Sequence, residues 1–239
     1  MSGAMRVRCA VLLALCLTMG AANAAPVEAR RYDAFWLWAG VRPQPVLANA
    51  RRVYLLQAEV PLDADAPARL VAQRAALPQL RHCQVWMVLR VERIDWTPAL
   101  FDAVLLQLQR WRAAGNDVAG LQIDFDAGTR HLEQYVAFLR TLRGRLPADY
   151  QLGITGLLDW SVNGRAETLA GLRGVVDEVV LQIYQGRAVI PDYPIYVARL
   201  DRLQVPFRIG LLQGGDWQPP RGLQDNPWFR GYVVFLRNP

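Results

Sequence analysis

The segment Val118-Ala-Gly-Leu-Gln-Ile-Asp-Phe-Asp126 is an apolar strand pattern that ends in two carboxylates. Successive side chains of a strand point to opposite faces, so Gln122, Asp124 and Asp126 are expected on one face and the apolar residues between them on the other. Carboxylates in an apolar setting repel each other and resist desolvation, so one of them tends to keep a proton near neutral pH. This property suits acid catalysis on a sugar, and the segment is the first candidate for a functional site.

Seven other apolar segments of similar length occur along the chain. They are near-continuous apolar runs, which is typical of parallel strands buried on both faces. With the first segment they predict eight strands, at residues 35–38, 53–59, 85–92, 120–126, 152–159, 179–185, 207–213 and 232–237.

Helical patterns lie between most of these strands. Thr97-Pro98 is a typical helix start, and Gly115 ends that helix. Thr129 is the expected N-cap of a second helix, which Gly144 stops. Shorter helices are expected at 66–77, 166–172 and 194–203. Eight strands alternating with helices in about 200 residues fit a small (β/α)8 barrel of the α/β class.

Three features favour an alternative, a flattened or incomplete barrel. The segment after the first strand is short and proline-rich, and residues 214–228 have the composition of a loop. The chain also stops just after the eighth strand, so the last helix of a complete barrel is missing.

Polar residues follow the strands at their C-terminal ends, where barrels of this type carry their active sites. The i, i+2 spacing recurs at 57/59, 90/92, 124/126 and 182/184, which places both members of each pair on one side. Aromatic residues lie at the same ends, and flat rings with a polar edge stack well on sugars. The expected substrate-binding residues are Trp38, Glu59, Arg90, Glu92, Gln122, Asp159, Trp160, Gln182 and Gln213.

The stretch from Ala119 to Asp126 resembles the fourth-strand signature DGxDxDxE of family 18 chitinases. Gly120 and Asp124 match that signature, whereas Ala119 and Gln122 replace its first two acids. The general-acid glutamate of the family falls at Asp126, which is one methylene shorter. This resemblance implies a barrel that acts on glycans.

The resemblance also implies roles for individual residues. Asp126 would be the acid that protonates the glycosidic oxygen, and Asp124 would orient the acetamido group that attacks the anomeric carbon. Tyr184 matches the tyrosine of the family's sixth-strand motif and would donate a hydrogen bond. More broadly, the chain resembles a secreted bacterial family known only as a domain of unknown function, through blocks that begin at Phe35, Gly120, Leu152, Gln182 and Gly231.

Three other interpretations remain open. Asp126 as acid with Glu59, Glu92 or Asp159 as base or nucleophile would make a glycoside hydrolase that needs no acetamido group. A catalytically inactive carbohydrate-binding barrel would keep the aromatic and polar groups without turnover. In a purely structural arrangement, Asp124 and Asp126 would pair with Arg90 and Arg208 inside the barrel mouth.

The first 24 residues have the composition of a signal peptide, with Arg6 and Arg8 before an apolar run and small residues up to Ala24. Cleavage there leaves residues 25–239 as a single domain, expected to be a periplasmic or secreted monomer without a membrane span. An uncleaved signal that anchors the protein is the alternative.

Charge and composition narrow the choice of partners. The net charge of +6 comes entirely from arginine, because the chain has no lysine. These arginines are scattered along the sequence, so nucleic-acid binding is not expected, and a polysaccharide or oligosaccharide is the expected partner. Only Cys83 lies outside the signal, and His82 and His131 are not at ligand spacing. No disulfide, metal or other cofactor is therefore expected.

Overall fold

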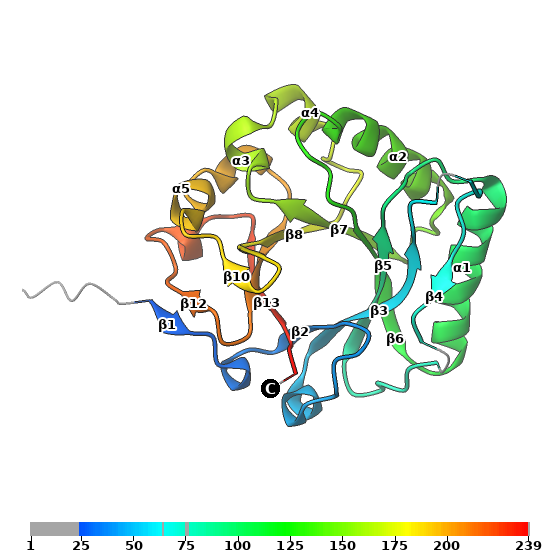
Figure 1. Cartoon of the computed structure of the whole chain (residues 1–239), viewed down its shortest axis with the longest axis horizontal. Coiled ribbons are helices and arrows are strands. Elements are labelled where there is room, and N and C mark those ends of the chain that lie inside the picture. The colour runs from blue at the N-terminus through cyan, green and yellow to red at the C-terminus, as the bar shows by residue number, and fades with distance from the viewer. Residues whose placement is uncertain (1–23, 64, 75–76, 239) are drawn as a thin grey trace, which may run out of the picture.

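Eight parallel strands close into a barrel in a computed structural model that describes residues 24–63, 65–74 and 77–238 (Figure 1). Each strand pairs with its neighbours around the ring, and pairing of β2 with β3 completes the circle. The predicted (β/α)8 class is confirmed. The barrel strands are β2 (Ala34–Leu37), β3 (Arg52–Val60), β5 (Gln84–Val91), β6 (Asp117–Asp124), β7 (Gln151–Leu157), β8 (Glu178–Gln182), β11 (Phe207–Leu212) and β13 (Phe229–Phe235).

The helices cover the outside of the barrel unevenly. The long helices α1 (Pro98–Ala113) and α2 (Leu132–Arg145) pack on one side of the ring, and shorter ones cover the side next to it (Figure 1). Thr97 caps α1 as expected, because its side-chain oxygen accepts a hydrogen bond from the Leu100 amide at 3.3 Å. The shorter helices are α3 (Trp160–Asn163), α4 (Ala166–Ala170) and α5 (Tyr193–Val197).

Three sequence-based helix predictions differ from the structure. The predicted N-cap Thr129 is wrong, since α2 begins at Leu132 with His131 at the cap. The helix expected at 194–203 is broken into α5 and the 3₁₀ turn η3 (Leu200–Leu203), which ends at Gln204 with a left-handed φ of 49°. No described residue of 66–77 is helical, because β4 (Val71–Ala72) pairs antiparallel with the end of β3 instead.

The remaining elements are short and lie in the loops. The proline-rich segment after β2 contains the 3₁₀ turn η2 (Pro45–Asn49) in place of a helix, and 214–228 is largely loop as expected. The other short elements are β1 (Ala25–Pro26), η1 (Ala29–Arg31), β9 (Tyr184–Gln185), β10 (Ala188–Val189), β12 (Asp216–Trp217) and η4 (Leu223–Asp225). The expected signal peptide lies outside the described residues except for Ala24.

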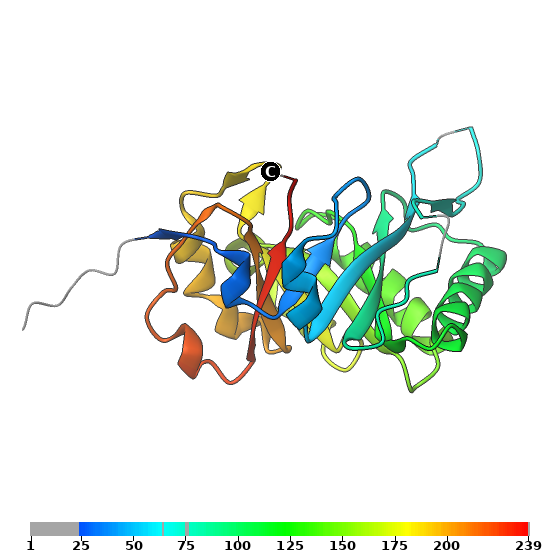
Figure 2. The same ribbon diagram turned by 90° about the horizontal axis from the view of Figure 1, so that it is seen from below.

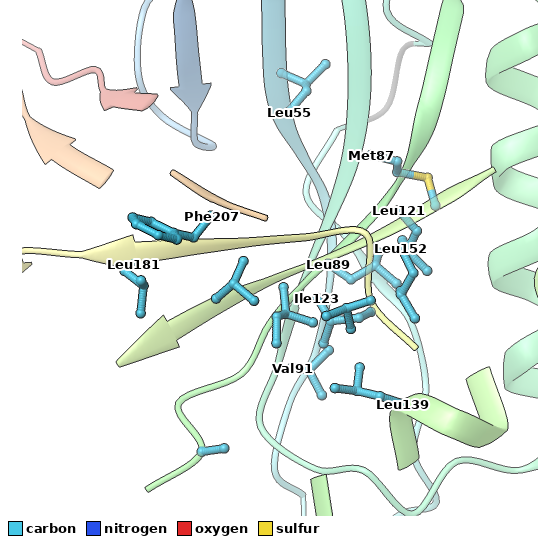
Figure 3. Packing of buried hydrophobic residues seen from close by; sticks show 14 of the residues in the cluster. Leu55, Met87, Leu89, Val91, Leu121, Ile123, Leu139, Leu152, Leu181 and Phe207 are labelled. Atoms are coloured by element: carbon cyan, nitrogen blue, oxygen red, sulfur yellow. The ribbon is translucent and has the colours of Figure 1, made fainter. Parts of the chain in front are cut away.

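Two hydrophobic clusters follow from the alternation of side chains along the strands. The larger one fills the space outside the barrel, where strand residues such as Met87 and Ile123 pack toward the helices and α2 contributes Leu139 (Figure 3). The smaller one fills the barrel interior with aromatic rings of Trp36, Tyr54 and Trp86. Adjacent rings of these three lie 6.0 and 5.6 Å apart, so the interior is a packed core.

Polar groups interrupt this interior at three levels. Near the N-terminal ends of the strands, Glu178 is buried against arginines. Halfway up, the Trp36 indole donates a 2.7 Å hydrogen bond to the Gln122 side chain. At the C-terminal ends, Asp124 is buried beside Thr155. Figure 2 shows the barrel from the side, with the C-terminus at the edge where the strands end.

Two strand glycines make room for the interior tryptophans. A Cβ atom on Gly210 would lie 2.6 Å from the Trp36 ring, and one on Gly153 would lie 2.8 Å from the Trp86 ring. Gly210→Ala is therefore expected to lower the free energy of unfolding by about 1–3 kcal/mol, because the rigid ring must shift. Urea denaturation measures this loss. Gly144→Ala, in open space on α2, is the control and is expected to stabilise by about 0.5–1 kcal/mol. Equal stability of wild type and Gly210→Ala would contradict the tight interior packing.

Candidate functional site

A cleft of about 590 Å³ opens at the C-terminal ends of the barrel strands. It lies where (β/α)8 barrels place their active sites. Seven of the residues predicted from sequence line it, namely Trp38, Arg90, Asp124, Asp126, Asp159, Gln182 and Tyr184. The other lining residues are Leu157, Leu158, Gln185, Gly186, Ile190, Tyr196 and Phe235.

Asp124 is the buried carboxylate of the cleft. It is the last residue of β6 and its side chain is 3% exposed. One oxygen accepts a 2.8 Å hydrogen bond from the Thr155 hydroxyl, and the other lies 3.1 Å from the Arg90 guanidinium. Burial raises the pKa of Asp124, although the Thr155 hydrogen bond and the charge of Arg90 oppose this shift and nearby Asp126 adds to it.

Asp126 is the exposed carboxylate above it. It follows the end of β6 by two residues, and its side chain is 61% exposed. A second nitrogen of Arg90 lies 3.6 Å from one Asp126 oxygen. One guanidinium therefore holds a buried and an exposed carboxylate together at one wall of the cleft.

Aromatic rings form another part of the lining. Phe235, at the end of β13, lies between Trp38 and Tyr184, with ring centroids 5.4 and 5.7 Å away. The Tyr184 hydroxyl is buried and has no hydrogen-bond partner among the described residues. Burial, followed by the negative charge of Asp124, raises the pKa of Tyr184. This hydroxyl is therefore neutral, and its capacity to donate a hydrogen bond is not used within the described residues.

Asp159 is the third carboxylate of the cleft. It follows β7 and precedes α3, and one of its oxygens is buried without a hydrogen-bond partner among the described residues. Burial raises the pKa of Asp159, and hydrogen bonds from the backbone partly oppose the shift. Like Tyr184, this residue has hydrogen-bonding capacity that the protein itself leaves unused.

Three residues that the sequence predicts to bind substrate do not line the cleft. Gln122 is fully buried below Asp124 and accepts the hydrogen bond from Trp36. Glu59 lies beside Arg90 in the strand register but does not line the cleft. Glu92 is exposed, and its carboxylate accepts a 2.9 Å hydrogen bond from the Leu62 amide, which fixes the loop after β3.

Two further predicted residues, Trp160 and Gln213, are not positioned to contact a ligand in the cleft. Trp160 is 0% exposed, and its indole donates a 2.8 Å hydrogen bond to the Ala127 carbonyl, so no face of this ring is free to stack on a sugar. Gln213 bonds with the Gln44 side chain and accepts from the Arg237 amide, so it ties the chain end to the loop after β2.

Phe235 and Tyr196 line the cleft but were not predicted. Strand alternation from Val233, which packs in the barrel interior, points to Phe235 as the residue at the mouth of the eighth strand. Tyr196 lies in α5, on the loop side of the barrel, and no periodic signal marks it. Arg208, expected beside Asp124 in the structural interpretation, pairs with Glu178 at the opposite end of the barrel.

No group of three or more His, Cys, Asp and Glu side chains gathers as a metal site in the described part of the chain. Within the same residues, no helix has the length and apolarity needed to cross a membrane.

Part of the chain matches the model of a known protein family. Residues 84–192 match the family model called Domain of unknown function (DUF3142). This segment includes every carboxylate of the cleft and Tyr184, while Trp38 and Phe235 lie outside it. The resemblance to a family known only as a domain of unknown function is confirmed. The sequence matches none of the curated proteins.

Several solved structures are similar to this one at low sequence identity. The xylanase and α-amylase inhibitor protein XAIP-II from Scadoxus multiflorus is 10% identical, with a TM-score of 0.52 and coverage of 85% of this chain and 92% of its own. The spore cortex-lytic enzyme SleL of Bacillus cereus is 18% identical with a TM-score of 0.45, and the match covers 75% of this chain and 50% of SleL. The chitinase domain of the spore coat protein CotE of Clostridium difficile is 12% identical, with a TM-score of 0.47 and coverage of 85% and 68%.

These similarities concern the barrel fold. The chain spans half the length of SleL. A shared fold does not by itself assign a function. The chain is an α/β barrel, and residues 84–192 of it match a domain of unknown function.

The buried state of Asp124 predicts a specific pH dependence of stability. Because its pKa is raised in the folded protein, the folded protein binds this proton at higher pH than the unfolded chain, whose Asp pKa is about 3.9. The contribution of Asp124 to stability is therefore full below that pH and falls as pH rises through the folded pKa. Tm of wild type minus Tm of Asp124→Asn is expected to be largest below about pH 3.9, to decrease as pH rises through the folded pKa of Asp124, and then to level off.

Thr155→Val is the matched variant for this measurement. It removes the hydrogen bond that lowers the pKa of Asp124, so the decrease is expected to extend to higher pH. A Tm difference that grows with pH would show that Arg90 and Thr155 lower the pKa of Asp124 by more than burial raises it. That result would contradict a raised pKa of Asp124 in the folded protein.

Proposed function

We propose that the protein is a glycan hydrolase that works in the cleft at the C-terminal ends of the strands. The observation that carries this proposal is the exposed Asp126 carboxyl directly above the buried Asp124, whose pKa is raised, in a cleft also lined by aromatic rings. Paired carboxylates in different environments can take different protonation roles at one pH. Aromatic rings supply the apolar faces on which sugar rings stack.

Asp126 is assigned the proton transfer to the glycosidic oxygen, because it is the carboxyl of this pair that solvent and substrate can reach. Cleavage breaks the bond between the anomeric carbon and that oxygen, which leaves as a hydroxyl, and water supplies the group added to the anomeric carbon. Asp124 holds Arg90 and Thr155 in place below the reacting carboxyl. Tyr184, which lines the cleft, is assigned a hydrogen bond to the substrate.

Asp159 is assigned the base that activates the attacking water. It is the cleft carboxylate outside the Arg90 cluster, and its raised pKa makes its ionised form a stronger base. Glu59 and Glu92 do not line the cleft, which leaves Asp159 as the partner for Asp126 among the three acids considered from sequence.

A second function, carbohydrate binding without turnover, is favoured by the ion pairs of Arg90. Both Asp124 and Asp126 lie within 3.6 Å of its nitrogens, and an aspartate replaces the longer glutamate of the resembling signature. A carboxyl withdrawn by about 1.5 Å is costly for catalysis, since a misplacement near 1 Å costs on the order of a hundredfold in rate. A binding barrel would tolerate this geometry.

The expected setting of either function is outside the cytoplasm. The signal-like first 24 residues support export to the periplasm or beyond, and the proposed partner is a polysaccharide or oligosaccharide bound by a monomer.

The proposal predicts that residues 25–239 release reducing ends from at least one of a panel of bacterial polysaccharides. Asp126→Asn is expected to lower this release by about a hundredfold or more, since it removes the acid. Glu133→Gln, an exposed change on α2, is the control and is expected to keep the wild-type rate. Reducing-sugar assays across the panel measure both effects.

Binding measurements separate the two functions. No release from any polysaccharide, with binding that survives Asp126→Asn but is weakened several-fold by Trp38→Ala, would reject the hydrolase and support the binding barrel. Release that survives Asp126→Asn would remove Asp126 from the chemistry.

A further inference from the structure

A second and larger cavity, of about 820 Å³, opens at the opposite end of the barrel. It is formed by the N-terminal ends of β2, β3, β5, β11 and β13 and by the turn η1. Six of its lining residues are arginines, namely Arg30, Arg31, Arg51, Arg52, Arg208 and Arg230. One lining residue, Asp33, is acidic.

The fold gathers cations that the sequence disperses. Arg30 and Arg31 lie before β2, Arg51 directly precedes β3 and Arg52 begins it. Arg208 and Arg230 are in β11 and β13. Parallel strands of a closed barrel start at the same end, so residues at the beginning of strands far apart in sequence lie around one opening. The sequence-based expectation that no basic cluster forms is wrong for this face.

Two of the arginines form a fixed inner wall. Arg52 and Arg208 lie 3.0 and 2.6 Å from the same oxygen of Glu178, which is buried. The Tyr54 hydroxyl donates to the other Glu178 oxygen. Arg52 also donates to Gln84 at 2.9 Å, and its guanidinium lies 5.7 Å from the Trp86 ring centroid. These guanidinium groups are therefore held in place before any ligand arrives.

The other four arginines form a rim with few counter-charges. Arg30 and Arg31 share one carboxylate, that of Glu28. Arg51 lies 3.8 Å from Asp33, but both side chains are largely exposed, and such pairs contribute little. The Arg230 side chain donates only to backbone carbonyls, and no carboxylate within the described residues lies in ion-pair distance of it.

The charges of the cavity do not cancel. Six guanidinium groups face three carboxylates, Asp33, Glu28 and Glu178, which leaves three positive charges in excess. Excess charge of one sign in a concave surface focuses the field and concentrates ions of the opposite sign. Guanidinium groups match phosphate and sulfate oxygens in pairs of parallel hydrogen bonds.

We propose that this cavity is a binding site for a multivalent oxyanion of the phosphate or sulfate class, distinct from the glycan cleft. Its volume exceeds what one small ion occupies and lies within the range of ligand sites. Tyr32 and Tyr232, whose rings meet edge to face at 5.6 Å, supply an aromatic part of the lining. The site therefore accepts the ion either free or as an ester on an acidic polysaccharide.

The test measures binding of inorganic pyrophosphate and of dextran sulfate by calorimetry at fixed ionic strength, with neutral dextran as the blank. The wild-type protein is expected to bind at least one anionic probe and to gain Tm in its presence. Arg51→Gln with Arg230→Gln is expected to weaken that binding at least about tenfold, since each removes hydrogen bonds to a charged group. Both residues are at the rim, so the fold is retained.

Arg110→Gln, an exposed change on α1, is the control and is expected to leave binding unchanged. Tighter binding of pyrophosphate identifies a free ion as the ligand, and tighter binding of dextran sulfate identifies a polymer. No binding of either probe, or an equal loss with Arg110→Gln, would overturn the proposal. Glycan release by the double variant is expected to equal that of wild type, so this test fails or succeeds independently of the proposed function.

Discussion

Burial of a single carboxylate, Asp124, constrains the whole mouth of the barrel. A charge 3% exposed at the end of β6 needs partners, and the neighbouring strands provide them: Arg90 from β5 and Thr155 from β7. Because these residues are neighbours in the strand register, the position of Asp124 also determines where Arg90 can hold Asp126. The exposed carboxylate of the cleft is thus placed by the buried one.

The barrel interior separates its two polar ends with a layer of aromatic rings. Trp36, Tyr54 and Trp86 pack across the middle, and the glycines opposite them leave room for the indoles. Above this layer lies a cleft with three carboxylates, and below it a cavity rich in arginine. The two ends of the barrel carry opposite charge because arginines lie at the beginnings of strands and aspartates at the ends of strands.

Much of the fold could be predicted from sequence, because buried parallel strands leave long apolar runs. All eight barrel strands lie where those runs predict them, and the two long helices follow their apolar patterns, with α1 also following its predicted cap. The segment 66–77 could not be predicted, because its antiparallel pairing with β3 is a tertiary contact that local composition does not encode. The break between α5 and η3 was not expected either.

The candidate site was predicted in part. The i, i+2 rule correctly placed Gln122 and Asp124 on the inner face, but it could not tell which depth along the strand reaches the cleft. Gln122 lies two residues before Asp124 in β6, below the cleft, and accepts a hydrogen bond from Trp36. Trp160 shows the same limit, since its place after a strand suggested a stacking platform, whereas α3 turns the ring into the core.

The arginine cavity could not be predicted from the sequence. Its residues are separated by up to 200 positions, from Arg30 to Arg230, and only closure of the barrel brings them together. Charge clusters formed by strand beginnings are invisible to any local scan of composition, whereas a run of carboxylates along one strand is visible at once.

The most direct test of this account is a carbon-detected NMR titration of the Asp side-chain carboxyls, assigned by the Asp124→Asn spectrum. The account predicts that Asp124 titrates above the ordinary Asp value of about 3.9, and that Arg90→Gln raises its midpoint further, because a favourable positive charge is lost. A midpoint at or below the ordinary value, or one that Arg90→Gln leaves unchanged, would contradict it. The buried carboxylate would then not organise the cleft.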